Sequence, residues 1–454
     1  MEIFRHLAVK VNGLNNSRGS GMLYEISNDG KNKYVLTAQH CLTNDKNKRS
    51  FTEDEISNIE IRDFEGTKLS ICDVKVPINV NLDFAVIEIN TEKVYPNISI
   101  ESATRGMDCI FFGFPKYLEA DNNPGEPMAG HIIEVLDEHV TLQNGNGNLD
   151  DSESDAKENT VGFSGSGLYT IGNNEPHLIG IVIRLRGVKG KHGKLQALKI
   201  EVVNNFLKEK NMHELIPYEL SAFDMYLDLI INEQDDKVKV ILRKHFKENV
   251  IDLKPLYIYQ KLKHKLFIPY NFDGQYLNVK LWEGWLRLII YICIYKGVEI
   301  KTDTIEQHIS LGSSSESNNR FYYSEAKRMA TFVRELYTEA YRDISNNDNI
   351  FVNSEKFAGP QSVGQGDIHN IIQCIDSVMF ENGIDITNEN EYKKVKIIHI
   401  DHIYNQLETE LIRFITSTTT TKQLQEKCVE CLISLFAEIE SPTQESEASK
   451  IEIN

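Results

Sequence analysis

The sequence predicts a two-domain protein in which an all-β N-terminal domain precedes a mainly α-helical one. A chain of 454 residues is long enough for more than one domain. Up to about residue 208, short apolar runs alternate with glycine turns, whereas after about residue 218 apolar residues recur at helical spacing. The tail after residue 440 is polar. We therefore expect domains at 1–212 and 213–440 and a disordered tail at 441–454.

In the N-terminal half, two polar side chains lie at the ends of predicted strands. Residues 33–38 indicate a buried strand that leads directly to His40. Residues 84–89 indicate a second buried strand, which Asp83 opens. Such rigid ends suit catalytic side chains, because a general base must stay within hydrogen-bond reach of its nucleophile.

Three short segments carry the residue types of a Ser-His-Asp nucleophile system. His40 lies in TAQHC, Asp83 in LDFAV and Ser164 in GFSGSG. His40 would take the proton of Ser164, and Asp83 would orient the imidazole and stabilise its protonated form. Glycines on both sides of Ser164 permit a tight turn with converging N–H groups, so Gly162 and Ser164 are the expected oxyanion hole. Each segment is common by itself, and their order and strand contexts support the joint interpretation.

In order and spacing, the three segments resemble the trypsin-like (chymotrypsin-fold) serine proteases, of an intracellular bacterial type. The resemblance covers about residues 5–210. It includes a glycine-flanked strand at 18–23, a strand and turn at 110–115, and a strand at 178–187 that would pair with the substrate backbone. It implies a double β-barrel and a serine endopeptidase that cleaves protein substrates through an acyl-enzyme, without a cofactor.

Two positions depart from the secreted members of that family. Those relatives place an Asp directly before the nucleophile, where it pairs with a new N-terminus released by cleavage, but this chain has Phe163. Their cysteine after the histidine forms a disulfide, but no cysteine precedes Cys41 in this sequence. We therefore expect activity without N-terminal processing and control by another route.

The expected substrate-binding residues give opposing indications about specificity. Glu158 lies shortly before Ser164, where the resemblance places the base of the specificity pocket, and an acid there favours Lys or Arg. Ile183, Arg184 and Leu185 replace the usual small residues of the pocket wall. Arg184 would repel a basic side chain, and Leu185 would narrow the entrance. Glu158 also ends an acidic run typical of a solvated loop, so basic specificity stays open.

Composition argues against several classes of protein. The formal net charge of −18 disfavours a nucleic-acid binder, whose phosphate contacts need clustered Lys and Arg. No segment has the roughly 18 uninterrupted apolar residues of a membrane span. The N-terminus has no apolar signal core and the seven cysteines are sparse, so we expect a cytoplasmic location. Cys428 and Cys431 have no second ligand pair nearby and are expected to pack in a helix, so no metal site is predicted.

The C-terminal half shows no recognisable catalytic group. Amphipathic spacing predicts helices at 237–247, 281–296, 329–340, 367–382, 400–416 and 422–439. This architecture resembles the helical C-terminal domains of bacterial multi-component defence systems, including the ABC-three-component systems, which implies a part in anti-phage defence. We expect the helical domain to bind a regulatory protein partner and to gate the protease, with the acidic segment 144–158 as the mobile element.

Two other functions stay open. The chain is alternatively a catalytically silent pseudoprotease scaffold, for which Arg184 and Leu185 are the best argument. It is alternatively an adaptor whose helical half binds partners while the β domain is incidental. A serine-directed probe separates both from an enzyme, because only an activated serine reacts.

Overall fold

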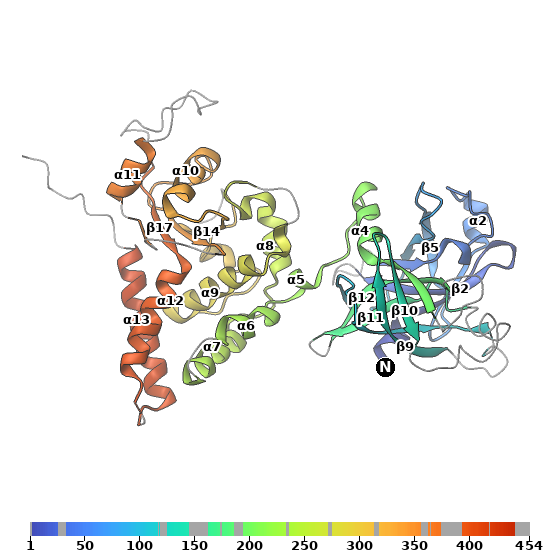
Figure 1. Ribbon diagram of the computed structural model, residues 1–454, viewed down its shortest axis with the longest axis horizontal. Helices are drawn as coiled ribbons and strands as arrows, with labels where there is room; N and C mark the ends of the chain where they lie inside the picture. The colour runs from blue at the N-terminus through green and yellow to red at the C-terminus, as the bar shows by residue number, and fades with distance from the viewer. Residues whose placement is uncertain are drawn as a thin grey trace, which may run out of the picture. The chain divides into compact units, whose positions relative to one another are not determined.

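The structure is a computed structural model that describes residues 2–25, 33–116, 118, 125–144, 162–172, 175–185, 194–232, 236–270, 275–312, 317–355, 362–363, 365–373, 393–416 and 418–440. It divides into two compact units, Met1–Tyr218 and Glu219–Asn454 (Figure 1). The first unit is built from two β-sheets, and the second from helices around a small sheet. Within the described ranges, every helix is too short or too polar to cross a bilayer.

The first sheet of the N-terminal unit is antiparallel, with the strand order β4-β1-β2-β3-β6-β5. Its strands are β1 (Ala8–Asn12), β2 (Arg18–Glu25), β3 (Lys33–Thr37), β4 (Glu60–Asp63), β5 (Ser70–Lys75) and β6 (Ala85–Asn90). Alternate residues of β2 face opposite sides, so that Leu23 joins the core enclosed by this sheet, while Met22 and Tyr24 face the second sheet. Among the described residues the edge strands β4 and β5 do not pair, so the sheet is an open half-barrel.

The second sheet closes into a barrel. Its strands are β7 (Ser99–Ile100), β8 (Asp108–Gly113), β9 (Glu126–Val135), β10 (His139–Asn144), β11 (Gly167–Gly172), β12 (Glu175–Leu185) and β13 (Lys194–Lys199). The order is β11-β8-β9-β10-β13-β12-β7, and an additional pairing of β11 with β12 completes the ring of six strands. The register of β12 against β13 shifts between Val182 and Arg184. Ile183 is therefore an unpaired bulge residue whose backbone is free for other contacts.

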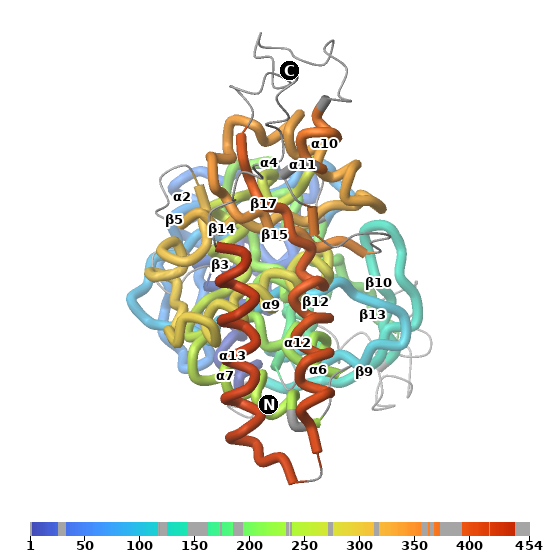
Figure 2. Tube along the Cα trace, turned by 90° about the vertical axis from the view of Figure 1, so that its left-hand side faces the viewer, coloured from blue at the N-terminus to red at the C-terminus, as the bar shows by residue number. Residues whose placement is uncertain are grey.

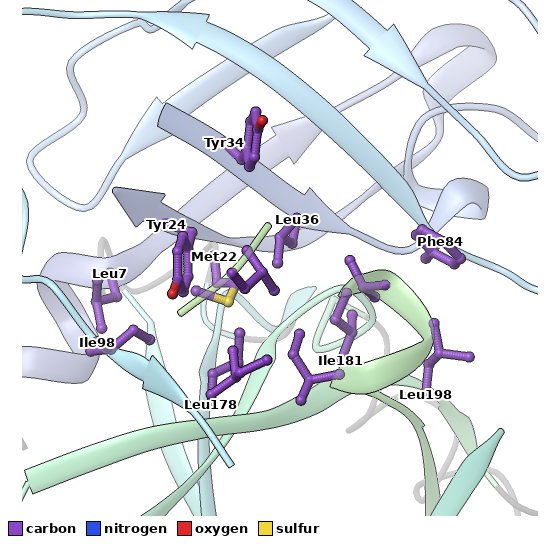
Figure 3. Packing of buried hydrophobic residues seen from close by; sticks show 14 of the residues in the cluster. Leu7, Met22, Tyr24, Tyr34, Leu36, Phe84, Ile98, Leu178, Ile181 and Leu198 are labelled. Atoms are coloured by element: carbon purple, nitrogen blue, oxygen red, sulfur yellow. The ribbon is translucent and has the colours of Figure 1, made fainter. Parts of the chain in front are cut away.

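A shared core joins the two sheets. Met22 and Leu36 of the first sheet and Leu178 and Ile181 of the second are fully buried in one cluster (Figure 3). Helices α1 (Glu2–Leu7) and α4 (Ile200–Glu209) add further apolar residues to this cluster. The segment after α4 also packs on this unit, because the Ile100 N–H donates to the Ile216 carbonyl at 2.8 Å. Residues 213–218 are therefore part of the N-terminal unit.

The C-terminal unit is organised around one buried helix, α9 (Val279–Lys296). Apolar residues cover most of its circumference, and Trp282 and Trp285 are fully buried. The Asn278 side chain caps its N-terminus, and Gly297 ends it in the left-handed conformation. The other α-helices of this unit are α5 (Tyr218–Ser221), α6 (Asp224–Ile231), α7 (Asp236–Asn249), α8 (Pro255–Leu262), α10 (Met329–Glu339), α11 (Gln365–Gln373), α12 (Ile400–Phe414) and α13 (Thr421–Glu440). The last two pack side by side (Figure 2).

A small mixed sheet lies within the helical unit. Strands β14, β15 and β17 run parallel, and β16 pairs antiparallel with β17. Their bounds are β14 (Asn319–Tyr323), β15 (Asn349–Asn353), β16 (Ser362–Val363) and β17 (Lys396–His399). Every residue of β15 is buried, as expected for a strand covered on both faces.

The predicted fold class, an all-β double-barrel domain followed by a mainly helical domain, is confirmed. The helices predicted at 237–247, 281–296, 329–340, 400–416 and 422–439 correspond to α7, α9, α10, α12 and α13. The helix predicted at 367–382 is present as α11 to Gln373, and residues 374–392 lie outside the described part of the chain. The mixed sheet was not predicted, because its strands are short apolar runs that resemble turns of buried helix.

Candidate active site

Antiparallel pairing of β3 with β6 brings His40 and Asp83 together. Thr37, the last residue of β3, pairs with Ala85, the first of β6, so the chain just after Thr37 meets the chain just before Ala85. A short 3-10 turn, Gln39–Cys41, then presents His40. The imidazole Nδ1 lies 2.7 Å from Asp83 Oδ2, and the His40 backbone N–H donates to Asp83 Oδ1 at 3.1 Å.

The carboxylate fixes both the orientation and the charge of the imidazole. Burial disfavours the protonated form of His40, but the hydrogen bond to Asp83 and the neighbouring Cys41 thiol raise its pKa to about 10. Burial likewise opposes ionisation of Asp83, but its bonds to His40 and the charge of Arg184 hold the pKa of the carboxyl below its usual range. Both side chains stay about one-third exposed, at 36% for His40 and 29% for Asp83, so a substrate can reach the pair.

The segment around Ser164 is a tight turn that depends on its glycines. Gly162 and Gly165 have φ of +106° and +89°, which side chains with a Cβ rarely adopt. A Cβ on Gly165 would also lie 2.0 Å from the Ser20 carbonyl oxygen. Between the glycines, Phe163 is buried in the second barrel, with its ring edge-on to Phe111 at 5.4 Å. The side chain before Ser164 therefore makes an apolar contact.

Ser164 lies against the histidine segment, but its hydroxyl does not bind His40. The Ser164 carbonyl accepts hydrogen bonds from the Cys41 thiol at 3.2 Å and from the Ser20 N–H at 2.8 Å. Its Oγ donates to the carbonyl of the bulge residue Ile183 at 2.9 Å. Among the described residues no hydrogen bond joins Ser164 Oγ to His40. Ser164 and His40 thus lie on adjoining segments with no hydrogen bond between their side chains, which we call the resting arrangement.

Three consecutive backbone donors of this turn have no protein acceptor within the described part of the chain. They are the N–H groups of Gly162, Phe163 and Ser164, and the first and third of them are the expected oxyanion hole. The next two N–H groups are used, since Gly165 donates to Val182 at 2.7 Å and Ser166 donates to Phe163 at 3.0 Å. Unused backbone donors beside a serine hydroxyl are what a developing oxyanion requires.

The expected substrate-binding residues have different positions. Ile183 is only 2% exposed and belongs to the core, so its backbone alone faces the site. Arg184 is exposed and donates through Nε to Gln196 Oε1 at 2.9 Å. Glu158 and the side chain of Leu185 lie outside the described residues, as does most of the segment 144–158.

Sequence reasoning did not identify Ser20 as part of the site. Its N–H contacts the carbonyl of Ser164 and its Oγ donates to the carbonyl of Gly162 at 2.6 Å. The available signal was the sequence Gly19-Ser20-Gly21, because flanking glycines allow another backbone to approach closely. Gly19 has this role toward Cys41: a Cβ at Gly19 would lie 2.2 Å from the Cys41 sulfur.

A second Ser-His-Asp trio, in the C-terminal unit, lacks the required hydrogen-bond direction. Ser354 Oγ lies 3.0 Å from His399 Nε2, and His399 Nδ1 accepts the backbone N–H of Asp401 at 3.2 Å. The proton of a neutral His399 is therefore on Nε2 and points to Ser354, which cannot lose its own proton to that atom. Burial lowers the pKa of His399, in keeping with a neutral ring. This trio caps α12 and carries no catalytic assignment.

Metal ligands do not converge in the described part of the chain, where no three His, Cys, Asp or Glu side chains form a group. Cys428 and Cys431 lie on α13 and are buried, at 1% and 7% exposed. Both therefore contribute to helix packing.

Comparison with known proteins gives matches to a family model and to solved structures. Residues 197–409 match the family model described as C-terminal domain 4 of the ABC-three component (ABC-3C) systems. This match confirms the predicted resemblance of the helical half. Among solved structures, the chain is similar to the crystal structure of the Rv3671c protease in its inactive form, with 17% identity, a TM-score of 0.31, and coverage of 45% of this chain and 89% of that one. A comparison with curated proteins finds no match.

Proposed function

We propose that this chain is a cytoplasmic serine endopeptidase that works in a multi-component defence system. The observation that carries the proposal is the His40–Asp83 pair, with its 2.7 Å hydrogen bond, next to a glycine turn that presents Ser164 and the unused N–H groups of Gly162 and Ser164. The fused C-terminal unit supports the second part, because it matches a domain of three-component systems. Anti-phage defence is the process in which we expect the protease to act.

The proposed reaction begins with a rotation of the Ser164 hydroxyl from the Ile183 carbonyl to His40 Nε2. His40 removes the hydroxyl proton while Oγ attacks the substrate carbonyl carbon, and the N–H groups of Gly162 and Ser164 bind the oxyanion. His40 then donates this proton to the leaving amine, which leaves an acyl-enzyme ester. Water, deprotonated by His40, attacks the ester carbonyl carbon, and His40 returns the proton to Ser164 Oγ as the C–O bond breaks and the acid product leaves. Asp83 stays ionised and stabilises the transient imidazolium.

The pH dependence of activity follows from the raised pKa of His40. Only the neutral imidazole accepts a proton, so the fraction of molecules with an active base falls about tenfold for each pH unit below the His40 pKa of about 10. We expect kcat/KM for a peptide substrate to increase tenfold per pH unit across the neutral range and to level off only in the alkaline range. The measurement is a pH profile with initial rates corrected for unfolding. A plateau that begins below neutrality would contradict the protonated resting state.

The resting arrangement also favours the alternative of a silent scaffold. Ser164 Oγ is bound to Ile183 and not to His40, as in a site that does not turn over. A fluorophosphonate probe distinguishes the two functions. Labelling of Ser164 in the full-length chain supports the protease, and complete inertness at alkaline pH, with or without partners, supports the scaffold.

We further propose that a protein partner of the C-terminal unit gates the protease. The purified full-length chain should hydrolyse peptides slowly, and addition of the partner components of its system should raise turnover. The reason is that partner binding can supply the free energy for the Ser164 rotation. A chain that ends at Tyr218 is the matched comparison, because residues 213–218 pack on the protease unit. Rapid cleavage by the full chain alone, unchanged in the truncated one, would contradict gating.

A further inference from the structure

We propose that Ser20 is a positioning residue that holds the oxyanion-hole turn in its working geometry from the first sheet. This role rests on the proposed protease function. Ser20 lies on β2, far from Ser164 in sequence, and its side chain is completely buried. It contacts neither substrate nor the reacting atoms, and it would act through the backbone of Gly162 and Ser164.

Ser20 binds this turn through both its side chain and its backbone. Its Oγ donates to the Gly162 carbonyl at 2.6 Å and accepts the Phe114 N–H at 2.9 Å. Its N–H donates to the Ser164 carbonyl at 2.8 Å. Its own carbonyl accepts a hydrogen bond from Thr37 Oγ1 at 2.6 Å, just before the histidine turn. One residue thus links the base segment, the nucleophile turn and the start of the second barrel.

Close packing around Ser20 confines its hydroxyl to one position. A Cβ on Gly113 would lie 2.9 Å from Ser20 Oγ and 2.7 Å from the Phe163 ring. A Cβ on Gly162 would lie 2.3 Å from the Phe114 carbonyl oxygen. Glycines at both positions therefore let the two chain segments close over the serine. A buried hydroxyl with one donor and one acceptor partner in such a space is fixed in orientation.

The backbone of Gly162 needs an anchor because glycine is the least constrained residue of the backbone. Its N–H is one of the two proposed oxyanion donors, while its carbonyl is held by Ser20 Oγ. The secreted trypsin-like proteases, which the N-terminal half resembles, have an Asp before the nucleophile that pairs with a new N-terminus after cleavage. Phe163 cannot form that pair, and the Ser20 hydroxyl supplies a neutral, permanent substitute. The hole can then be formed without processing.

The test compares Ser20→Ala with Ser99→Ala in the full-length chain. Ser99 is the matched control, because it is also buried in the N-terminal unit and its hydroxyl hydrogen-bonds His177 at 2.7 Å, away from the turn. Active sites are counted with a fluorophosphonate, and kcat is expressed per labelled serine. We expect Ser20→Ala to lower kcat per site about 10- to 100-fold with KM changed by less than about twofold. The reason is that misplaced N–H donors weaken the binding of the transition state and leave the binding of the substrate unchanged.

A purely structural role gives a different result. It would lower Tm and the fraction of labelled chains in both variants, while kcat per labelled serine stays at the wild-type value in Ser20→Ala, and that result overturns the proposal. Affinity for a peptide aldehyde, which forms a tetrahedral adduct, should fall in parallel with kcat in Ser20→Ala only. If Ser20→Ala does not fold, Ser20→Cys keeps the volume with a weaker donor and should show the same loss in smaller degree. A wild-type chain that never labels overturns the protease function itself, and with it this role.

Discussion

Ser164→Ala should abolish covalent labelling by a serine-directed fluorophosphonate and lower peptide hydrolysis by about 10⁴- to 10⁶-fold, the usual effect of removing a triad residue. The reason is that the Ser164 hydroxyl belongs to the turn with the unused N–H groups, and the Ser164 carbonyl accepts a hydrogen bond from Cys41, the neighbour of His40. The substitution removes one hydroxyl whose bond to the Ile183 carbonyl is part-buried, so Tm should change little. The measurements are labelling followed by peptide mapping, single-turnover hydrolysis and thermal unfolding.

Ser166→Ala is the matched control for this prediction. Ser166 lies in the same turn and is fully buried, and its Oγ has no hydrogen-bond partner among the residues that the structure describes. Its removal should leave labelling of Ser164 intact. Labelling that survives in Ser164→Ala and disappears in Ser166→Ala would show that the nucleophile is the other serine.

The second large effect is expected for Asp83→Asn. An amide cannot stabilise the imidazolium and permits the wrong tautomer of His40, so kcat should fall about 10⁴-fold, or about 5 kcal/mol of transition-state stabilisation. The same change removes the main cause of the raised His40 pKa. The residual activity should therefore reach its plateau at lower pH than in the wild type, although its level is far lower. Initial rates across the pH range give both quantities.

Asp63→Asn separates this effect from the general loss of a carboxylate. Asp63 is buried in the same sheet and binds Lys93 at 2.8 Å, away from His40. This variant should lose stability without a change in the pH profile. If Asp63→Asn lowers kcat as far as Asp83→Asn does, the orienting role of Asp83 is wrong.

Most of the candidate site could be predicted from the sequence because its parts are local. His40 and Asp83 each adjoin a buried apolar strand, and such strands are recognisable one at a time. The glycines around Ser164 indicate a turn by themselves. That the three segments lie together in space could be inferred only from their order and spacing. The pairing of Thr37 with Ala85 explains this proximity for His40 and Asp83.

Other features could not be predicted because they depend on contacts between distant segments. The bond from Ser164 Oγ to Ile183 requires a bulge in β12, and nothing in the local sequence marks one extra residue in a strand. The anchoring by Ser20 depends on how β2 meets the second barrel. In the C-terminal unit, β15 and β17 are too short to be distinguished from helix by periodicity.

The residues of the candidate site come from two sheets, so the site is assembled only when the two sheets pack together. His40 and Asp83 belong to the half-barrel, whereas Ser164 belongs to the closed barrel, and the shared apolar core holds the two together. Neither sheet by itself contains all three residues of the candidate site. The proposed activity would therefore depend on the cooperative folding of the whole N-terminal unit. Any substitution that weakens the inter-sheet core would lower the fraction of molecules with an assembled site without changing a residue of that site.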